Sequence, residues 1–98
     1  MFQLRIRGLA QNDIQEIVDY YETKTSKRIT DCFLDNLYIE LQFIKTKPTS
    51  FQLKHKDTRV RYIKSFPFGI HYRIKNKNII EILAVLHTSR NPNIWKNR

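Results

Sequence analysis

Several kinds of functional site need residues that this sequence has in short supply. Its 98 residues include one cysteine, Cys32, and two glycines. One cysteine cannot form a disulfide within the chain, and without a cysteine pair or an acidic cluster we expect no metal site. Two glycines are too few for a glycine-rich loop around a phosphate group. We therefore expect the protein to work without a metal or another cofactor.

Acidic residues and long apolar runs are scarce as well. Nine acidic residues stand against eighteen basic ones, which gives a net charge of +9. A charge so far from zero indicates an anionic partner, such as a nucleic acid, an acidic protein or a membrane surface. No apolar run is long enough for a membrane span and no signal peptide is evident, so we expect a soluble cytoplasmic protein without membrane attachment. At this length we expect residues 1–98 to form a single small domain.

The sequence does contain three predicted strands in succession. We expect them over about Thr58–Ser65, Phe68–Lys75 and Ile79–Leu86. The middle stretch alternates apolar and mainly polar residues, as a strand with one buried face does. The turn after it is Asn76–Asn78, because asparagine tolerates the backbone conformations of tight hairpins. The third stretch is almost continuously apolar, which is typical of a strand that is covered on both faces.

The first half of the chain predicts one strand and two helices. Phe2–Arg7 alternates like a short strand, and apolar residues then recur at helical spacing over about Leu9–Lys24 and about Lys27–Lys45. The short link between the helices favours an antiparallel helical hairpin. Pro48 cannot continue the second helix, so we expect a loop over Thr46–Asp57. The predicted buried stripe of the second helix consists of Ile29, Phe33, Leu34, Leu37, Leu41 and Ile44.

Together these elements predict an α+β fold. An N-terminal strand precedes an antiparallel helical hairpin, which packs on one face of a mostly antiparallel sheet that ends in a three-strand meander. The strongest charge signal is a cluster of basic residues without acidic residues beside it: Lys54, Lys56, Arg59, Arg61, Lys64, Arg73 and Lys75. We expect Tyr62 and Tyr72 to lie near enough to this basic face to stack on a nucleic-acid base. Arg90 either contacts a target or helps to turn the chain so that Trp95 packs on the sheet.

Four stretches of the sequence, taken in order, resemble a known family. They are LAQNDIQEIVDYYE in the first predicted helix, FLDNLYIELQFIKTKPTSF from the second helix onward, RVRYIKSFPFGIHYRI across the first hairpin, and AVLHTSRNP at the end of the last strand. Their order and spacing in a basic chain of this length resemble toxins of the RelE/ParE superfamily, from bacterial type II toxin–antitoxin systems. The resemblance implies a cognate antitoxin, a heteromeric complex with it, and a toxic target in replication or translation.

The superfamily has two activities, and they need different residues. RelE-like members cut mRNA on the ribosome, whereas ParE-like members poison DNA gyrase and need no hydrolytic site. Metal-free cleavage of RNA needs a base, a cation at the phosphate and an acid at the leaving oxygen. The resemblance places Arg61 at the phosphate and His87 as acid or base, and strand alternation places Arg73 on the same non-core side as Arg61. Some nuclease members carry a tyrosine after this histidine, but here it is Thr88. The loop also has no glutamate to serve as base, and only Asp57 is nearby.

These departures favour a ParE-like inhibitor of DNA gyrase over a RelE-like, ribosome-dependent mRNA endonuclease. Arg61, Arg73 and His87 are catalytic only in the nuclease; otherwise the arginines are solvated and the histidine hydrogen-bonds the tail at the strand end. The expected contacts with the target or with nucleic acid are Lys54, Lys56, Arg59, Lys64, Tyr62, Tyr72 and Arg90. A further alternative is a non-catalytic basic module that binds DNA or RNA, or a degenerate toxin that still binds its antitoxin.

Overall fold

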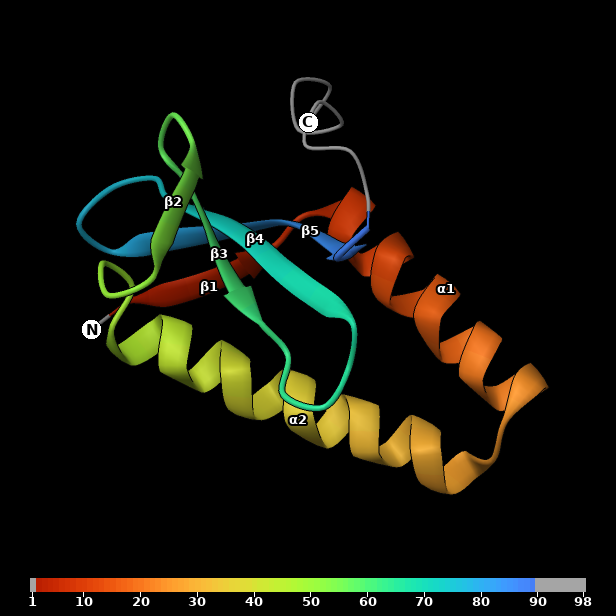
Figure 1. Ribbon diagram of the computed structural model, residues 1–98. Helices are drawn as coiled ribbons and strands as arrows, with labels where there is room; N and C mark the ends of the chain where they lie inside the picture. Colours follow the sequence, from red (N-terminus) through yellow and green to blue (C-terminus); the bar gives the residue numbers. More distant parts are fainter. Residues whose placement is uncertain (1, 90–98) are drawn as a thin grey trace.

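The computed structural model describes residues 2–89 of the chain, apart from the side chain of His55. The elements in these residues are β1 (Gln3–Ile6), α1 (Gly8–Lys24), α2 (Lys27–Thr46), β2 (Gln52–His55), β3 (Thr58–Tyr62), β4 (Phe68–Ile74) and β5 (Ile79–His87). The strands form a five-stranded sheet in the order β1-β5-β4-β3-β2, with α1 and α2 as a helical hairpin beside it (Figure 1). β1 is parallel to β5, and all other neighbouring strands are antiparallel. The predicted α+β fold is confirmed.

The ends of both helices follow from local chemistry. α2 begins after Ser26, whose hydroxyl oxygen accepts a hydrogen bond from the backbone N–H of Ile29 at 3.4 Å. This contact satisfies one of the backbone donors that a helix N-terminus leaves without a partner. At the other end, Pro48 has no backbone N–H and cannot extend the helix. α1 ends at Lys24, and the hydroxyl of the next residue, Thr25, donates to the carbonyl oxygen of Tyr21 at 2.6 Å. The short link that remains makes the two helices antiparallel.

An apolar core lies between the helical hairpin and one face of the sheet. Its buried residues are Ala10 and Ile17 from α1, Phe33, Leu37 and Ile44 from α2, Ile63, and Ile70, Tyr72, Ile80, Ile82 and Val85 from the sheet. Aromatic rings close one end of this core. The ring of Phe33 meets Phe66 and Phe68 edge-on, with ring centroids 5.4 and 5.8 Å apart. The helices therefore cover one face of the sheet, as the alternation of β4 predicts.

Two details of the predicted fold are wrong. Thr46–Asp57 is not a loop throughout, because it contains β2, which pairs with β3 at the edge of the sheet. β2 is four residues long with one apolar side chain, Leu53, so its alternation is too short to recognise in the sequence. Ile29 and Leu34, expected in the buried stripe of α2, are 37% and 39% exposed. The stripe passes instead through Glu40, an acidic residue that is 4% exposed.

The remaining strands end near their predicted positions. β3 stops at Tyr62 and not at Ser65, which has a positive φ of 70° and belongs to the following turn. β5 continues to His87, one residue beyond its predicted end. Arg90 and Trp95 lie outside the described residues. Within residues 2–89, neither helix combines the length and the apolar character that a membrane crossing needs.

Candidate functional site

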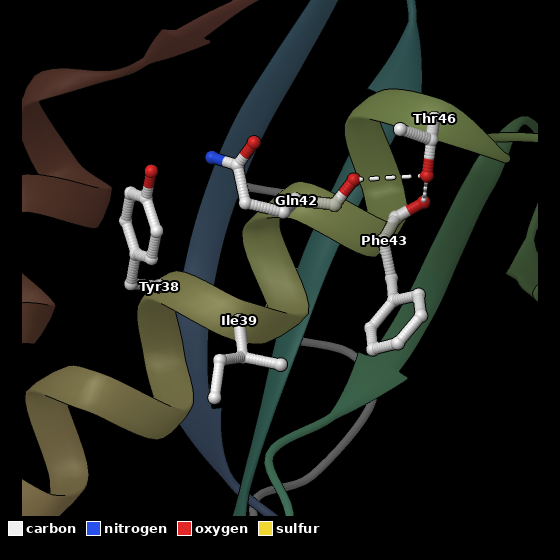
Figure 2. Close-up of a pocket in the computed structure, with 5 residues that line it drawn as sticks. All are labelled: Tyr38, Ile39, Gln42, Phe43 and Thr46. Carbon is white, nitrogen blue, oxygen red and sulfur yellow. Dashed lines mark hydrogen bonds between the residues drawn. The ribbon is translucent and has the colours of Figure 1, made fainter.

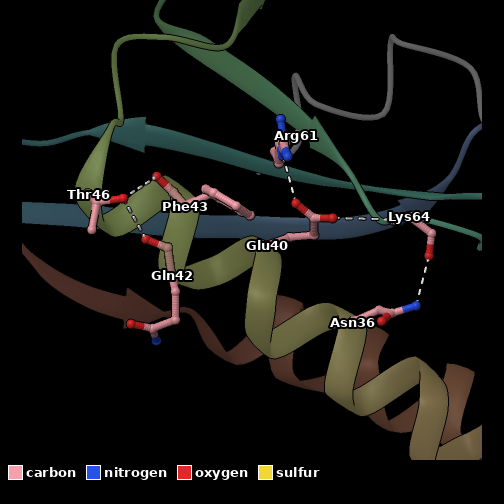
Figure 3. A network of polar contacts seen from close by, with 7 residues as sticks. All are labelled: Asn36, Glu40, Gln42, Phe43, Thr46, Arg61 and Lys64. Carbon is pink, nitrogen blue, oxygen red and sulfur yellow. Dashed lines mark hydrogen bonds and ion pairs between the residues drawn. The ribbon is translucent and has the colours of Figure 1, made fainter.

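Arg61 is held in an ion pair between the sheet and the helical hairpin. Its Nε donates a hydrogen bond to Oε1 of Glu40 at 2.7 Å, and Oε2 of the same carboxylate accepts from the backbone N–H of Lys64 at 3.3 Å (Figure 3). The guanidinium carbon lies 5.1 Å from the ring centroid of Phe43 and 4.5 Å from that of Phe51. The pair joins α2 to β3, neutralises the charge of Arg61 and fixes the direction of its side chain.

Arg73 lies on the opposite face of the sheet, so the expectation that it shares one side with Arg61 is wrong. Residues paired across neighbouring strands point to the same face. Arg61 pairs with the core residue Ile70, whereas Arg73 pairs with Glu81 on the face away from the helices. The difference arises on β3, where arginines alternate with apolar residues. Val60 is buried on the face away from the helices. Because successive side chains of a strand point to opposite faces, Arg59 and Arg61 point toward the helical side.

The carboxylate of Glu81 lies among several basic side chains. Arg73 donates from Nε to Oε1 of Glu81 at 2.8 Å. This hydrogen bond lowers the pKa of Glu81, aided by the charges of Arg73, Lys75 and Arg7 and opposed by burial. Arg5 pairs with Glu81 across β1 and β5. The predicted basic cluster was expected to have no acidic residues beside it. That expectation is wrong for two of its arginines, because Arg61 contacts Glu40 and Arg73 contacts Glu81.

Arg59 and Tyr72 hold the segment before β2 against the helical side of the sheet. Nη1 of Arg59 donates to the carbonyl oxygens of Phe51 and Thr49, at 2.8 and 3.3 Å. The hydroxyl of Tyr72 donates to the carbonyl oxygen of Pro48 at 2.6 Å. Burial raises the pKa of Tyr72 to about 12, although Arg59 opposes the shift. Tyr72 is 0% exposed and cannot stack on a base, so that expectation is wrong.

Four other predicted contact residues are exposed on or beside β2 and β3: Lys54, Lys56, Lys64 and Tyr62. Tyr62 is 47% exposed, and Nζ of Lys54 lies 6.0 Å from the centroid of its ring. The ring packs over Gly69, where an added Cβ would lie 3.3 Å from two of the ring carbons. The position of these side chains permits contact with a target, and their role stays a prediction. Arg90 lies outside the described residues.

His87 is exposed at the end of β5 and is hydrogen-bonded to Ser89. Its Nδ1 accepts from the backbone N–H of Ser89 at 3.1 Å, and Oγ of Ser89 lies 2.8 Å from the same nitrogen. A ring nitrogen that accepts from an N–H carries no proton, so the neutral imidazole holds its proton on Nε2. The ring also packs edge-on against Phe68, with centroids 5.4 Å apart. This geometry matches the interpretation of His87 as a hydrogen-bonded residue at the strand end.

The three residues expected to act in a nuclease do not converge. Arg61 lies on the helical face and Arg73 on the opposite face. His87 pairs with Phe68, five residues from Arg73 along β4, which corresponds to about 17 Å along a strand. Their catalytic roles stay predictions that apply only to a nuclease. Within residues 2–89, no group of three or more His, Cys, Asp or Glu side chains is placed to hold a metal ion.

The sequence pattern does not predict an apolar surface on the outward side of α2. Tyr38, Ile39 and Phe43 are 63%, 49% and 45% exposed. With Gln42 and Thr46 they line a shallow hollow of about 320 Å³ (Figure 2). We call these five residues the α2 surface. The signal for it is present in the sequence, since three large apolar residues of the helix lie outside its buried stripe.

Comparisons with known proteins agree with this fold. The family described as "ParE toxin of type II toxin-antitoxin system, parDE" matches residues 4–92 of the chain. A solved structure titled "Chromosomal ParDE TA system from P. aeruginosa" has a TM-score of 0.78 and 18% sequence identity, and the match covers 89% of this chain and 96% of that one. None of the curated protein sequences matches significantly. Because the family match covers most of the chain, this protein belongs to the ParE toxin family, within the RelE/ParE superfamily of type II toxin–antitoxin systems.

Proposed function

We propose that this ParE-family toxin inhibits DNA gyrase and is neutralised by a cognate antitoxin. The placement of Arg61 is the observation that favours gyrase over mRNA cleavage. A metal-free nuclease needs a cation already placed where negative charge develops on the phosphate. The guanidinium of Arg61 is instead committed to the buried carboxylate of Glu40 at 2.7 Å. Inhibition of gyrase by binding needs no assembled acid, base and phosphate cation, so the separation of these residues does not prevent it.

The charge of the chain supports an antitoxin as the second partner. The net charge is +9, and lysines such as Lys54, Lys56 and Lys64 are exposed. An acidic, disordered segment can fold as it wraps around such a surface, and opposite charges accelerate the encounter. The similar structure from P. aeruginosa is titled as a ParDE system, which suggests a ParD-type antitoxin for this chain. The neutralised form is then a heteromeric complex of the two proteins.

The choice of target is tested with two reactions on the same purified toxin. One measures supercoiling of relaxed plasmid by DNA gyrase, and the other maps cuts in translated mRNA by primer extension. We expect loss of supercoiling, accumulation of cleaved DNA, and intact mRNA. Addition of the antitoxin in excess should restore supercoiling, which controls for effects of a basic protein on DNA. Full gyrase activity at toxin concentrations that arrest growth would contradict the proposed target.

A RelE-like, ribosome-dependent mRNA endonuclease is the second candidate, and His87 is the observation that favours it. The side chain is exposed at the end of β5, where an acid or base can reach a substrate. In a nuclease, His87→Ala should lower cleavage about 100-fold or more, as expected for loss of a general acid or base. Binding of the antitoxin should not change. Ribosome-dependent cuts that disappear in His87→Ala would replace gyrase with mRNA as the target.

Toxicity itself separates these two functions from the non-toxic alternatives. We expect expression of the chain alone to arrest growth, and co-expression of the small protein encoded beside it to restore growth. A degenerate toxin would bind that protein without arresting growth. A basic module that binds nucleic acid without chemistry would do neither, and its affinity for DNA or RNA would fall steeply with salt. Normal growth with soluble, full-length protein would therefore contradict the proposed toxin.

A further inference from the structure

Basic side chains gather on the face of the sheet that is turned away from the helical hairpin. Arg5 of β1, Glu81 of β5 and Arg73 of β4 are partners in one row across three strands that lie side by side (Figure 1). Side chains two positions further along a strand return to the same face, so Arg7 and Lys75 belong to it as well. Besides the hydrogen bond from Arg73, the charges of Lys75 and Arg7 lower the pKa of Glu81, which places both near this row. We call Arg5, Arg7, Arg73 and Lys75 the outer patch.

The outer patch forms a diagonal stripe across these strands. The backbone N–H of Arg7 donates to the carbonyl oxygen of Ile82, and that of Lys75 donates to the carbonyl oxygen of Ile79. Because β1 runs parallel to β5 and β4 antiparallel to it, Arg7 and Lys75 lie on opposite sides of the row that contains Glu81. They are four residues apart along the strands and two strand spacings apart across them, which corresponds to about 13 Å and about 10 Å. Each DNA strand carries one charge per about 3.4 Å of helix axis, so such a stripe can contact several phosphates.

The cations of the outer patch are available to a ligand. Arg5, Arg7 and Lys75 are exposed, and the side chain of Arg73 is 38% exposed. Glu81 is the one acidic residue in the five strands that residues 2–89 form, and its side chain is 11% exposed and bound to Nε of Arg73. A guanidinium has five N–H donors, so this hydrogen bond leaves the two Nη groups of Arg73 for an anion. Glu81 therefore orients Arg73 and offsets only part of the charge of the four basic residues.

The surroundings of the outer patch favour the backbone of duplex DNA over a protein or a single strand. Protein interfaces are centred on apolar and aromatic side chains, whereas DNA interfaces are more polar and carry more positive charge. Among residues 2–89, the large apolar side chains that are exposed all lie outside β1, β4 and β5. These strands therefore offer no exposed aromatic ring of the kind on which proteins stack the bases of single strands. Three of the four cations are arginines, and each planar guanidinium can bind two phosphate oxygens at once.

We propose that the outer patch binds the phosphate backbone of duplex DNA without reading its sequence. Phosphate contacts position a protein on DNA, whereas sequence preference needs contacts with the bases. Binding of this kind needs no gyrase, so it goes beyond the proposed function and does not depend on it. Because DNA is the substrate of gyrase, the same contacts would also help to hold the toxin on a complex of gyrase with DNA.

The test measures binding of a short, fluorescein-labelled DNA duplex of mixed sequence to the full-length toxin by fluorescence anisotropy. Arg5→Gln combined with Lys75→Gln removes two exposed cations of the outer patch and keeps the ion pair between Arg73 and Glu81. We expect this double variant to bind the duplex about tenfold or more weakly, because two phosphate contacts are lost. The slope of log affinity against log salt should fall in magnitude by about two, or one for each contact.

Lys27→Gln combined with Arg28→Gln is the matched control. It removes the same charge from two exposed residues at the start of α2, away from the outer patch. Its affinity for the duplex should stay within about threefold of the wild type, and its salt dependence should not change, since these side chains contact no phosphate.

Each outcome bears on the inference once thermal unfolding confirms that the variants are folded. Equal weakening in the two double variants would show that affinity follows net charge alone, which overturns the outer patch as a site. A wild-type toxin that does not bind the duplex at about 50 mM salt would overturn it as well. So would a patch variant that loses binding to labelled single-stranded RNA or to the antitoxin but still binds the duplex. Gyrase inhibition without binding of the duplex contradicts the outer patch alone, and binding of the duplex without gyrase inhibition contradicts the proposed target alone.

Discussion

Glu40 of α2 and Arg61 of β3 form an ion pair that joins the helical hairpin to the sheet, with Oε1 and Nε 2.7 Å apart. The side chain of Glu40 is 6% exposed and that of Arg61 is 32% exposed. A carboxylate this deeply buried needs a partner, because an isolated buried charge costs several kcal/mol. The pair therefore explains how an acidic residue can occupy the buried stripe of α2 between Leu37 and Ile44.

We expect Arg61→Met to lower the free energy of unfolding by about 2–4 kcal/mol. This loss is smaller than the loss expected when a fully buried ion pair is broken, because part of the Arg61 side chain reaches solvent. Methionine keeps an apolar stem between Phe43 and Phe51, so the loss reports mainly on the charge left on Glu40. Urea denaturation of the single variants and of Arg61→Met with Glu40→Gln measures the coupling between the two residues. A stability equal to that of the wild type in Arg61→Met would mean that the pair behaves like an exposed surface ion pair.

The order of elements can be predicted from this sequence, but the direction of the β3 side chains cannot. Helical spacing, Ser26 and Pro48 define α2, and the alternation of β4 identifies its buried face. The face of β3 depends on its register with β4, and an alternation of arginine with apolar residues is compatible with either direction. The buried carboxylate that receives Arg61 lies 21 residues away along the chain. Its partner becomes apparent only when the fold brings the two elements together.

The candidate site was less predictable than the fold for the same reason. Exposure of lysines such as Lys54 follows from composition, since charged side chains are rarely buried without a partner. The burial of Tyr72 depends on the carbonyl oxygen of Pro48, which accepts its hydroxyl. The α2 surface depends on which flank of the helix faces the sheet. The sequence contains Tyr38, Ile39 and Phe43 whether that flank is covered or open.

Leu37 tests the assignment of the buried side of α2. It is 5% exposed, so Leu37→Ala should lower the free energy of unfolding by about 2–5 kcal/mol. In a domain whose total stability is about 5–15 kcal/mol, this is a large share. Leu34→Ala is the control on the same helix, because Leu34 is 39% exposed and should cost less than about 1 kcal/mol. Equal losses in the two variants, measured by chemical denaturation, would contradict the observed orientation of α2.

Glu81 predicts a loss of stability in acid. Its pKa in the folded protein lies below the ordinary value of 4.5, chiefly because Arg73 donates a hydrogen bond to the carboxylate. The unfolded chain therefore binds a proton at higher pH than the folded one, so acid favours unfolding. The stability from this group is fully present above pH 4.5 and is lost as the pH falls through the lowered pKa of the folded protein.

Comparison with Glu81→Gln isolates this effect from the other carboxylates. The variant keeps a side chain of the same size but cannot titrate, so it should be less stable than the wild type at neutral pH. The difference in free energy of unfolding should shrink as the pH falls from 7 to about 3, because only the wild type loses the charge at this position. A difference that stays constant over this range would show that the ion pair with Arg73 does not lower the pKa of Glu81.

Tyr72 predicts the opposite pH dependence, at alkaline pH. Burial raises its pKa from 10.0 to about 12, and its hydroxyl donates to the carbonyl oxygen of Pro48 at 2.6 Å. A raised pKa means that the folded protein keeps the proton longer than the unfolded chain. The stability from this group is fully present below pH 10.0 and is lost as the pH rises toward about 12.

Tyr72→Phe removes both the proton and the hydrogen bond. It leaves the carbonyl oxygen of Pro48 buried without its donor, so we expect a loss of about 1–3 kcal/mol at neutral pH. The difference in free energy of unfolding between wild type and variant should decrease above pH 10.0, because the wild type then loses the contribution of the protonated hydroxyl. Tyr38→Phe is the control, since Tyr38 is 63% exposed and its hydroxyl should contribute little to stability. If Tyr72→Phe is as stable as Tyr38→Phe at neutral pH, the hydrogen bond that holds Pro48 against β4 does not stabilise the fold.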